Sequence, residues 1–312
     1  MLLVFGSINL DLCFRCASLP GRGETVLAGG MAAAPGGKGA NQAHAAQRYG
    51  VPTQLVGAVG ADAFAEPALR CLRASGVGLQ ALQRLPGATG LASVGVDTQG
   101  ENQILVAPGV NLALRHEHVT DALLAQHRVL LMQMETDPAQ NLALAARARR
   151  LGLLTLLNNA PAQALPEELL AQLDVLIVNA VELVQSAAPL GIGPGDALDV
   201  LHALADRCRL TVLLTRGARG AVARARGRDW QVPACRVTVQ DSTGAGDTFA
   251  GVFAAARAEG RELVDALQRA SVAAALACRS PGAQPSQPAR GEIEAELAGY
   301  LASLGSPEGP AG

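Results

Sequence analysis

The segment Val129-Leu130-Leu131-Met132-Gln133-Met134 is an apolar run of strand length, and it decides the fold class. A helical pattern follows at Ala139–Leu151, and a second apolar run follows at Leu153–Leu157. A strand, a helix and another strand in this order form the unit from which parallel sheets are built. Further strand-like runs lie at Leu2–Phe5, Leu55–Val59, Val175–Val178 and Thr211–Thr215. The sequence therefore predicts an α/β protein with three α/β/α layers and a mostly parallel central sheet.

Helical patterns alternate with these strands. They lie at Gly39–Tyr49, Phe64–Ala74, Glu167–Gln172, Glu182–Ala188, Asp196–Cys208, Thr248–Glu259, Glu262–Cys278 and Glu292–Leu304. The runs Ala221–Ala225 and Asp229–Val232 flank Gly227 and predict a hairpin.

Four short runs depart from this alternation and are separated by glycine and proline turns. They are Cys13–Arg15, Glu24–Met31, Leu91–Asp97 and Gln103–Ala107. We expect them to form a small β lid from two insertions, residues 12–34 and 88–108, on one domain that spans residues 1–312. The last residues, 306–312, are rich in proline and glycine, and we expect a disordered tail.

Composition excludes several classes of function. The net charge is −2, and no basic stripe is interleaved with aromatic residues, so we expect no nucleic-acid partner. The apolar run Met1–Phe5 is too short for a signal peptide or a membrane span, so we expect no membrane association. We expect a cytoplasmic protein, with the nucleus as a second location in a eukaryote, and reduced thiols at all six cysteines, including the pair Cys13 and Cys16.

Several familiar motifs are missing or incomplete. Gly36-Gly37-Lys38-Gly39 comes nearest to a P-loop, but the residue after Lys38 is glycine rather than serine or threonine. Gly217-Ala218-Arg219-Gly220 lacks the remaining glycine of a dinucleotide fingerprint. His116-Glu117-His118 has no further metal ligand nearby, so we interpret it as a solvated face.

Polar residues gather where the predicted strands end. In a parallel sheet these ends share one edge, so their side chains can meet in one crevice. The residues are Asn9, Asp11, Asn41, Glu135, Asn179, Glu182, Thr215, Asp241 and Asp247. Each has a simpler interpretation: Asn179 can be only a helix N-cap, Asp11 only a turn residue and the glycines at 37 and 39 only a tight turn.

The segment Asp241-Ser242-Thr243-Gly244-Ala245-Gly246-Asp247-Thr248-Phe249 predicts a site for an anion. A strand-like run, Cys235–Gln240, leads into it and a helix leads out. Small residues at a helix N-terminus expose N–H groups, and the helix dipole adds positive charge there. Asp247 is then either a first-turn acid that complements the dipole or a base that takes a proton from a hydroxyl. We favour the base.

Six motifs together resemble the ribokinase-like (phosphofructokinase-B type) family of sugar and nucleoside kinases, in the form that ribokinases carry. The resemblance extends from Leu2 to about Leu304. The motifs are Gly6–Asp11, Gly36–Ala43, Asn158–Ala162, Asn179-x-x-Glu182, Asp241–Asp247 and Gly282–Ser286.

The resemblance implies transfer of a phosphoryl group from ATP to the 5-hydroxyl of D-ribose, with Asp247 as the base and the amides of Gly244, Ala245 and Gly246 as the anion hole. The implied ribose-binding residues are Asn9, Asp11, Gly37, Lys38, Gly39, Asn41, Glu135 and Asp247. The implied nucleotide-binding residues are Asn179, Thr215, Arg216, Gly217, Gly220, Gly246 and Ser271.

The same resemblance implies two metal ions and a partner. Glu182 would hold Mg²⁺ through water. An activating K⁺ would be held by Asp241, Thr243, Ala277, Ser280, Gly282 and Ser286, largely through backbone carbonyls. Two chains would form a homodimer through the β lid.

Two departures and three alternatives remain. Ser242 replaces the family's usual threonine, and Ser280-Pro281 stands where basic residues are common. The alternatives are a kinase for deoxyribose or fructose, a kinase for a nucleoside such as adenosine, and a catalytically inactive sugar-binding regulator. A nucleoside kinase needs a surface that stacks a second base, and only 3% of the residues are aromatic.

Overall fold

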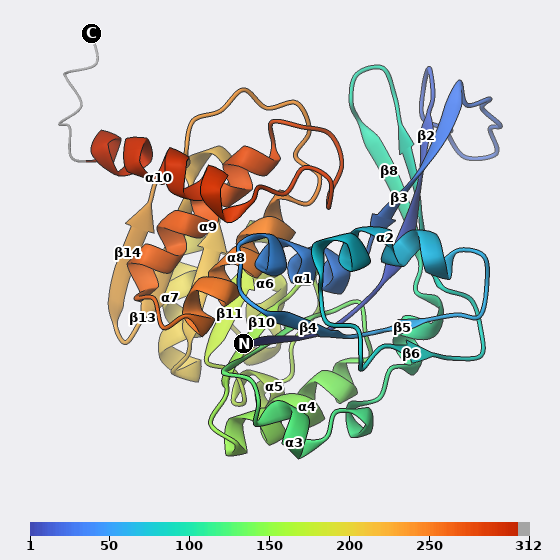
Figure 1. The fold of residues 1–312 in the computed structure, drawn as a ribbon. Helices are drawn as coiled ribbons and strands as arrows, with labels where there is room; N and C mark the ends of the chain where they lie inside the picture. The colour runs from blue at the N-terminus through green and yellow to red at the C-terminus, as the bar shows by residue number, and fades with distance from the viewer. Residues whose placement is uncertain (305–312) are drawn as a thin grey trace, which may run out of the picture.

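A computed structural model describes residues 1–304, and an eight-stranded sheet forms the centre of the molecule (Figure 1). Its strand order is β14-β13-β12-β11-β10-β9-β1-β4. Six strands of this sheet are parallel: β4, β1, β9, β10, β11 and β12. The strands β13 and β14 are added antiparallel at one edge. The bounds are β1 Leu2–Phe5, β4 Thr53–Val56, β9 Val129–Gln133, β10 Leu154–Asn158, β11 Val175–Val178, β12 Thr211–Thr215, β13 Ala221–Ala225 and β14 Arg228–Val232. The predicted parallel sheet and the hairpin at Gly227 are confirmed.

Helices cover both faces of this sheet, because its strands are apolar on both sides. Along β1, Leu2 and Val4 pack into one core, and Leu3 and Phe5 pack into the other. The first core is covered by α1 Lys38–Arg48, α2 Ala65–Ser75, α8 Ala245–Ala258, α9 Leu263–Ala277 and α10 Arg290–Leu304. The second is covered by α3 Asp121–Leu124, α4 Pro138–Arg150, α5 Glu167–Leu170, α6 Ala180–Ala187 and α7 Ala197–Cys208. The three-layer prediction is confirmed.

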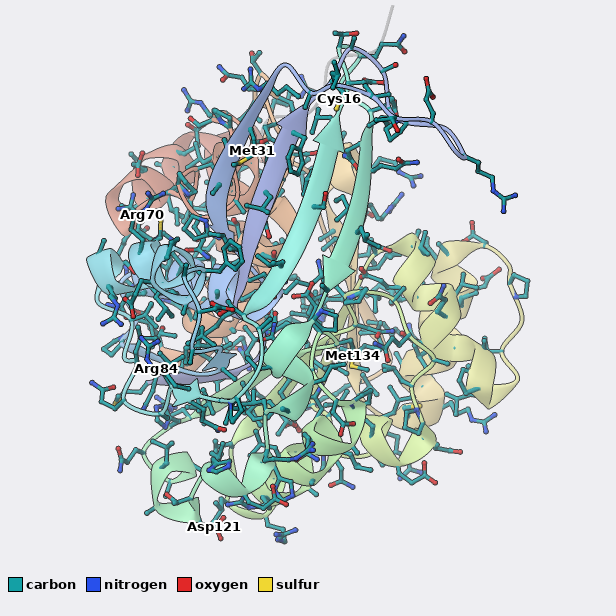
Figure 2. All side chains as sticks on the ribbon, turned by 90° about the vertical axis from the view of Figure 1, so that its right-hand side faces the viewer. Cys16, Met31, Arg70, Arg84, Asp121 and Met134 are labelled. Atoms are coloured by element: carbon teal, nitrogen blue, oxygen red, sulfur yellow. The ribbon has the colours of Figure 1, made fainter. Side chains whose placement is uncertain are left out.

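A separate four-stranded sheet, in the order β3-β2-β7-β8, projects from the body (Figure 1). Its strands are β2 Asn9–Arg15, β3 Gly30–Gly36, β7 Gly90–Val96 and β8 Asn102–Ala107. Figure 2 shows a face of this sheet, with Met31 and Cys16 toward its outer end. Two further short strands, β5 Ala58–Val59 and β6 Gln83–Arg84, pair with each other. Four 3-10 turns complete the described part of the chain: Gly109–Ala113, His116–His118, Ala188–Leu190 and Gly217–Arg219.

Several predictions of local structure are wrong. The strand expected at Glu24–Met31 begins only at Gly30, because β2 ends at Arg15 and pairing starts where Gly29 N–H bonds the Arg15 carbonyl at 2.8 Å. Asp11 lies inside β2 rather than in a turn after the first strand.

The run Cys235–Gln240 is not a strand. Its end is bound to the loop after α9, where the backbone N–H groups of Gln240 and Asp241 both donate to the Cys278 carbonyl. Helix α8 starts at Ala245 rather than Thr248, so Asp247 is inside its first turn. The tail predicted at 306–312 lies outside the described residues. Among the described helices, none is long and apolar enough to cross a membrane.

Candidate active site

The N-terminus of α8 is built around a glycine in the left-handed conformation. Gly244 has a φ of 75°, and a Cβ there would lie 2.9 Å from Cα and Cβ of Ala283. The chain therefore makes its turn into the helix at a position that only glycine fits without strain. The N–H groups of Gly246 and Asp247 then start the helix without an acceptor inside it. A Cβ at Gly246 would meet nothing within 4 Å, so space is open in front of these amides.

Asp247 is buried, with 8% of its surface exposed, and both of its carboxylate oxygens accept hydrogen bonds. Asn41 Nδ2 donates to Oδ2 at 2.9 Å, and Gln42 Nε2 donates to Oδ1 at 2.9 Å. Both donors lie on α1, which packs directly against α8. The carboxylate is thus fixed beside the open amides of the same helix turn, an arrangement that suits a base next to an anion site.

Charged side chains surround Asp247 on the side of the small sheet. The negative charge of Asp247 raises the pKa of Lys38 more than burial lowers it. Burial, together with the charges of Glu135 and Asp247, raises the pKa of Asp11 to about 6. Glu135 Oε2 accepts from the Lys38 backbone N–H at 2.9 Å and from the Ser7 hydroxyl. Three carboxylates and one ammonium group therefore lie close together. The carboxylates can accept hydrogen bonds from the hydroxyls of a polyol, and the ammonium group can donate hydrogen bonds to them.

Glycines allow the first residues of β2 to approach the start of α1. Gly37 has a φ of 87°, and a Cβ there would lie 2.6 Å from the Asn9 backbone nitrogen. The Asn9 side chain is in turn held by Asn111, whose Nδ2 donates to Asn9 Oδ1 at 2.8 Å. A Cβ at Gly39 would lie 2.5 Å from the Gly6 carbonyl carbon, so the backbones of the two motifs touch. The predicted sugar-binding residues thus meet where the small sheet joins the large one.

A cavity of about 610 Å³ opens in front of Ala245 and Gly246. Five of the predicted nucleotide-binding residues line it: Thr215, Gly217, Gly220, Gly246 and Ser271. The rest of its wall includes the apolar residues Val237, Val239, Ala274 and Ala275. The other two predicted residues, Asn179 and Arg216, line a neighbouring cavity of about 400 Å³, which also borders Thr215 and Gly217. A long ligand with an apolar ring and anionic groups fits this pair of cavities.

Asn179 and Glu182 form a capping box at the start of α6. Asn179 Oδ1 accepts from the backbone N–H groups of Val181 and Glu182, and Glu182 Oε2 accepts from Asn179 N–H at 2.8 Å. Asn179 is therefore a helix N-cap, as the simpler interpretation of this residue predicts. Burial raises the pKa of Glu182, and the charge of Lys38 opposes this shift. The carboxylate therefore lies within electrostatic reach of the charged cluster.

Asp241 ties the segment before α8 to the loop after α9. Its Oδ1 accepts from Thr243 N–H at 2.9 Å, and its Oδ2 accepts from Gly282 N–H at 2.8 Å. Burial alone would raise the pKa of Asp241, but these hydrogen bonds outweigh it and hold the pKa below its usual value. Ser286 Oγ donates to the Ala283 carbonyl at 3.0 Å within the same loop.

The described residues contain no group of three or more His, Cys, Asp or Glu side chains that could hold a metal ion. A cation at Asp241 would depend on one carboxylate and on backbone and hydroxyl oxygens of Thr243, Ala277, Ser280, Gly282 and Ser286. That donor set fits a hard monovalent ion better than a transition metal. The motif His116-Glu117-His118 was the other candidate for a metal site. There Arg147 Nη1 lies 3.3 Å from His116 Nδ1, so the His116 ring faces a cationic side chain.

Several buried polar residues that contact the site were not predicted as site residues. They are Ser7, Gln42, Asn111, Gln133, Asn158 and Gln284. Gln133 and Asn158 end the buried strands β9 and β10, so the rule that identified Glu135 identifies them as well. Gln42 follows Asn41 on a helix, where neighbours point in different directions, and sequence gave no reason to expect both on one carboxylate.

Comparison with known proteins gives a consistent result. Residues 1–290 match the family described as "pfkB family carbohydrate kinase". Among curated relatives, the ribokinase of Lactococcus lactis is 32% identical and the deoxyribokinase of Salmonella typhi is 30% identical. The first alignment covers 94% of this chain and 96% of the relative, and the second covers 91% and 94%.

Two solved structures are similar over nearly the whole fold. The ribokinase of Thermotoga maritima has a TM-score of 0.89 at 29% identity, with 95% of this chain and 99% of that chain covered. The ribokinase of Arabidopsis thaliana complexed with ribose and ATP has a TM-score of 0.86 at 29% identity, with 95% and 98% covered.

Proposed function

The chain belongs to the pfkB family of carbohydrate kinases and is a sugar kinase, and from that premise we propose that it phosphorylates D-ribose at the 5-hydroxyl with ATP. The observation that carries the proposal is the buried Asp247 carboxylate in the first turn of α8, beside open backbone amides and the larger cavity. The named relatives support ribose as the sugar, and the Arabidopsis structure holds ribose and ATP together.

The sugar lies between the two sheets in this proposal. Asp11 and Glu135 accept hydroxyl hydrogens, and Asn9, Lys38 and Asn41 donate to hydroxyl or ring oxygens. Gly37 and Gly39 let the backbone approach the ring because they carry no Cβ.

The reaction takes place at the start of α8. Asp247 accepts the proton of the 5-hydroxyl as its oxygen attacks the γ-phosphorus in line and the bond to the ADP oxygen breaks. We assign the charge on the moving phosphoryl group to the amides of Gly244, Ala245 and Gly246, to which the helix dipole adds. The Gly246 N–H has no acceptor inside the helix, whereas the Ala245 N–H also donates to the Ser242 carbonyl at 3.2 Å. Because phosphoryl transfer needs little covalent help, position and charge supply most of the acceleration.

ATP occupies the two neighbouring cavities. Its base lies against the apolar wall near Ala274 and Ser271, and its phosphates extend past Thr215 and Gly217 toward Gly246. Gly220 lines the larger cavity, and Arg216 and Asn179 line the smaller one. This direction puts the γ-phosphoryl group next to Asp247.

Two ions complete the proposed site. Glu182 would hold a water of Mg²⁺, and Asp241 with the loop at 280–286 would hold K⁺. Mg²⁺ would supply neutralising charge on the ATP phosphates, and K⁺ would supply further positive charge near the start of α8. The chain's own contribution at the K⁺ site is the pair of N–H bonds that fix the Asp241 carboxylate.

The small sheet serves as both a lid and a dimer interface. Its strand β8 is exposed along its length, and Leu27, Ile104 and Leu105 are 90%, 59% and 76% exposed. An apolar hollow of about 430 Å³ lies on the same sheet. A second copy of the chain would cover these side chains, and closure of the sheet over the sugar would limit ATP hydrolysis by water. Since ATP is the donor, we place the enzyme in the cytoplasm.

An ADP-release assay with ribose, deoxyribose, fructose and adenosine tests the substrate. We expect the highest kcat/KM with ribose. Deoxyribose is the principal rival, because the Salmonella relative is a deoxyribokinase, and a preference for it would replace ribose in the proposal. If none of the four compounds stimulates ADP release while ribose still binds in calorimetry, the result would favour an inactive sugar-binding regulator.

A further inference from the structure

Two hydrogen-bond chains, each made of buried side-chain amides, end on the two carboxylate oxygens of Asp247. We propose that Gln42 is a positioning residue that sets the orientation of this carboxylate, and that Asn158 on the central sheet sets the orientation of Gln42. The proposal rests on the proposed role of Asp247 as the base.

The first chain starts at a backbone carbonyl, which can only accept. Asn158 Nδ2 donates to the Ile177 carbonyl at 3.1 Å, so Asn158 Oδ1 must face the other way, toward Gln42. Gln42 must then present its NH₂ group, which donates to Asn158 Oδ1 at 2.9 Å and to Asp247 Oδ1 at 2.9 Å. The direction of every amide in this chain therefore follows from the sheet's backbone.

The remaining atom of the Gln42 amide is also occupied. Gln133 Nε2 donates to Gln42 Oε1 at 2.7 Å. Gln42 and Gln133 are fully buried, and Asn158 is 7% exposed. Among the described residues Gln133 Oε1 is already buried without a partner. Rotation of the Gln42 amide would leave further buried donors and acceptors unpaired, at an additional cost in free energy. Gln42 therefore holds one position.

The second chain reaches the other oxygen from the loop after α9. Gln284 Nε2 donates to Asn41 Oδ1 at 3.0 Å, so Asn41 presents Nδ2 to Asp247 Oδ2. Each carboxylate oxygen has one N–H donor and keeps a further lone pair. The plane of the carboxylate is thus fixed from two sides, and the unused lone pairs can face the hydroxyl that reacts.

Position matters here because the base must meet a hydroxyl at hydrogen-bond distance while the oxygen attacks in line. A displacement of about 1 Å in such an arrangement costs on the order of 10²-fold in rate. Gln42 supplies this position without touching the sugar in this arrangement.

The test compares Gln42→Met with wild type. Methionine has nearly the shape of glutamine but donates no hydrogen bond. We expect kcat to fall on the order of 10²-fold and the calorimetric Kd for ribose to stay unchanged. A wild-type kcat in this variant would overturn the proposal.

Asn158→Leu acts one step further away. It removes the acceptor that orients Gln42, so we expect a smaller fall in kcat with the Kd for ribose again unchanged, and a wild-type kcat would also count against the proposal. This variant decides the question if Gln42→Met does not fold.

Asn159→Leu is the matched control. Asn159 is equally buried, but its amide bonds Gln163 O and Ser186 Oγ, outside both chains. We expect Asn159→Leu to lower Tm with kcat retained, and an equal loss of kcat in it would show that lost stability alone explains the effect.

Asp247→Asn separates this inference from the proposed function. If Asp247→Asn is inactive and Gln42→Met retains the wild-type kcat, only the positioning role is wrong. If Asp247→Asn itself turns over normally, the assignment of the base is wrong, and the positioning role is lost with it.

Discussion

The two glycines at the start of α8 should respond differently to the same added methyl group. In Gly244→Ala the new Cβ meets Ala283 at 2.9 Å, and the backbone φ of 75° is unfavourable for alanine. In Gly246→Ala the new Cβ meets nothing within 4 Å and the backbone is helical. The pair therefore separates a structural requirement for glycine from a requirement for open space.

The magnitudes follow from this geometry. A left-handed alanine costs about 1–2 kcal/mol, and overpacking against Ala283 adds about 1–3 kcal/mol. With an unfolding entropy of about 2.1 cal/mol/K per residue, Gly244→Ala should lower Tm by about 3 to 8 °C. Gly246→Ala should keep or slightly raise Tm, because alanine is the better helix former by about 1 kcal/mol. Its methyl group instead enters the space that we assign to the phosphoryl group, at a cost of about 10- to 200-fold in kcat/KM for ATP.

Differential scanning calorimetry and ADP release with ribose measure the two effects. We expect Gly244→Ala to lose both stability and activity, and Gly246→Ala to lose activity alone. Wild-type activity in Gly246→Ala would refute the reasoning, because the space in front of the first turn would then not hold the transferred group.

Three further predictions concern pH, the lid and the cation. Because burial raises the pKa of Asp11 to about 6, KM for ribose should rise as the pH falls below about 6, and Asp11→Asn should raise the Tm of the ligand-free protein at pH 7. The gain in Tm should fade as the pH falls from 6 to 3.8, because wild-type Asp11 then becomes protonated in the folded protein. An equal gain in Tm at pH 7 and at pH 3.8 would contradict the raised pKa of Asp11. Leu105→Asp should give monomers in sedimentation velocity while Leu301→Asp, exposed on α10, does not; unchanged dimers, or wild-type monomers, would contradict the lid interface. K⁺ should stimulate turnover more than Na⁺, and an equal rate in cation-free buffer would argue against the site at Asp241.

Sequence periodicity was sufficient to predict the strands of the large sheet. The strands are buried on both faces, so Val129–Gln133 and Val175–Val178 appear as continuous apolar runs that have one interpretation. Exposed segments carried less information. Glu24–Ala28 has the residues of a strand but no partner opposite it, and Cys235–Gln240 is held by the Cys278 carbonyl rather than by a neighbouring strand. Both errors arise because pairing depends on tertiary contacts that local pattern does not encode.

The residues of the site also differ in how well the sequence predicts them. Residues at strand ends, such as Glu135 and Thr215, were predictable because topology alone puts them at one edge of the sheet. Two amides behind Asp247 were not predictable. Gln42 contacts Asp247 only because α1 packs against α8, and Gln284 contacts Asn41 from the loop after α9, far away in sequence. Only burial and hydrogen-bond direction in the folded chain identify them.

The most direct test of the central claim is the kcat of Asp247→Asn with ribose and ATP. Asparagine keeps the shape of the side chain but cannot accept the proton of the 5-hydroxyl, and general base catalysis contributes about 10²- to 10⁴-fold. We expect a loss of that size in kcat, with the Kd for ribose retained in calorimetry. A variant that keeps more than about a tenth of the wild-type kcat would contradict the assignment of Asp247 as the base.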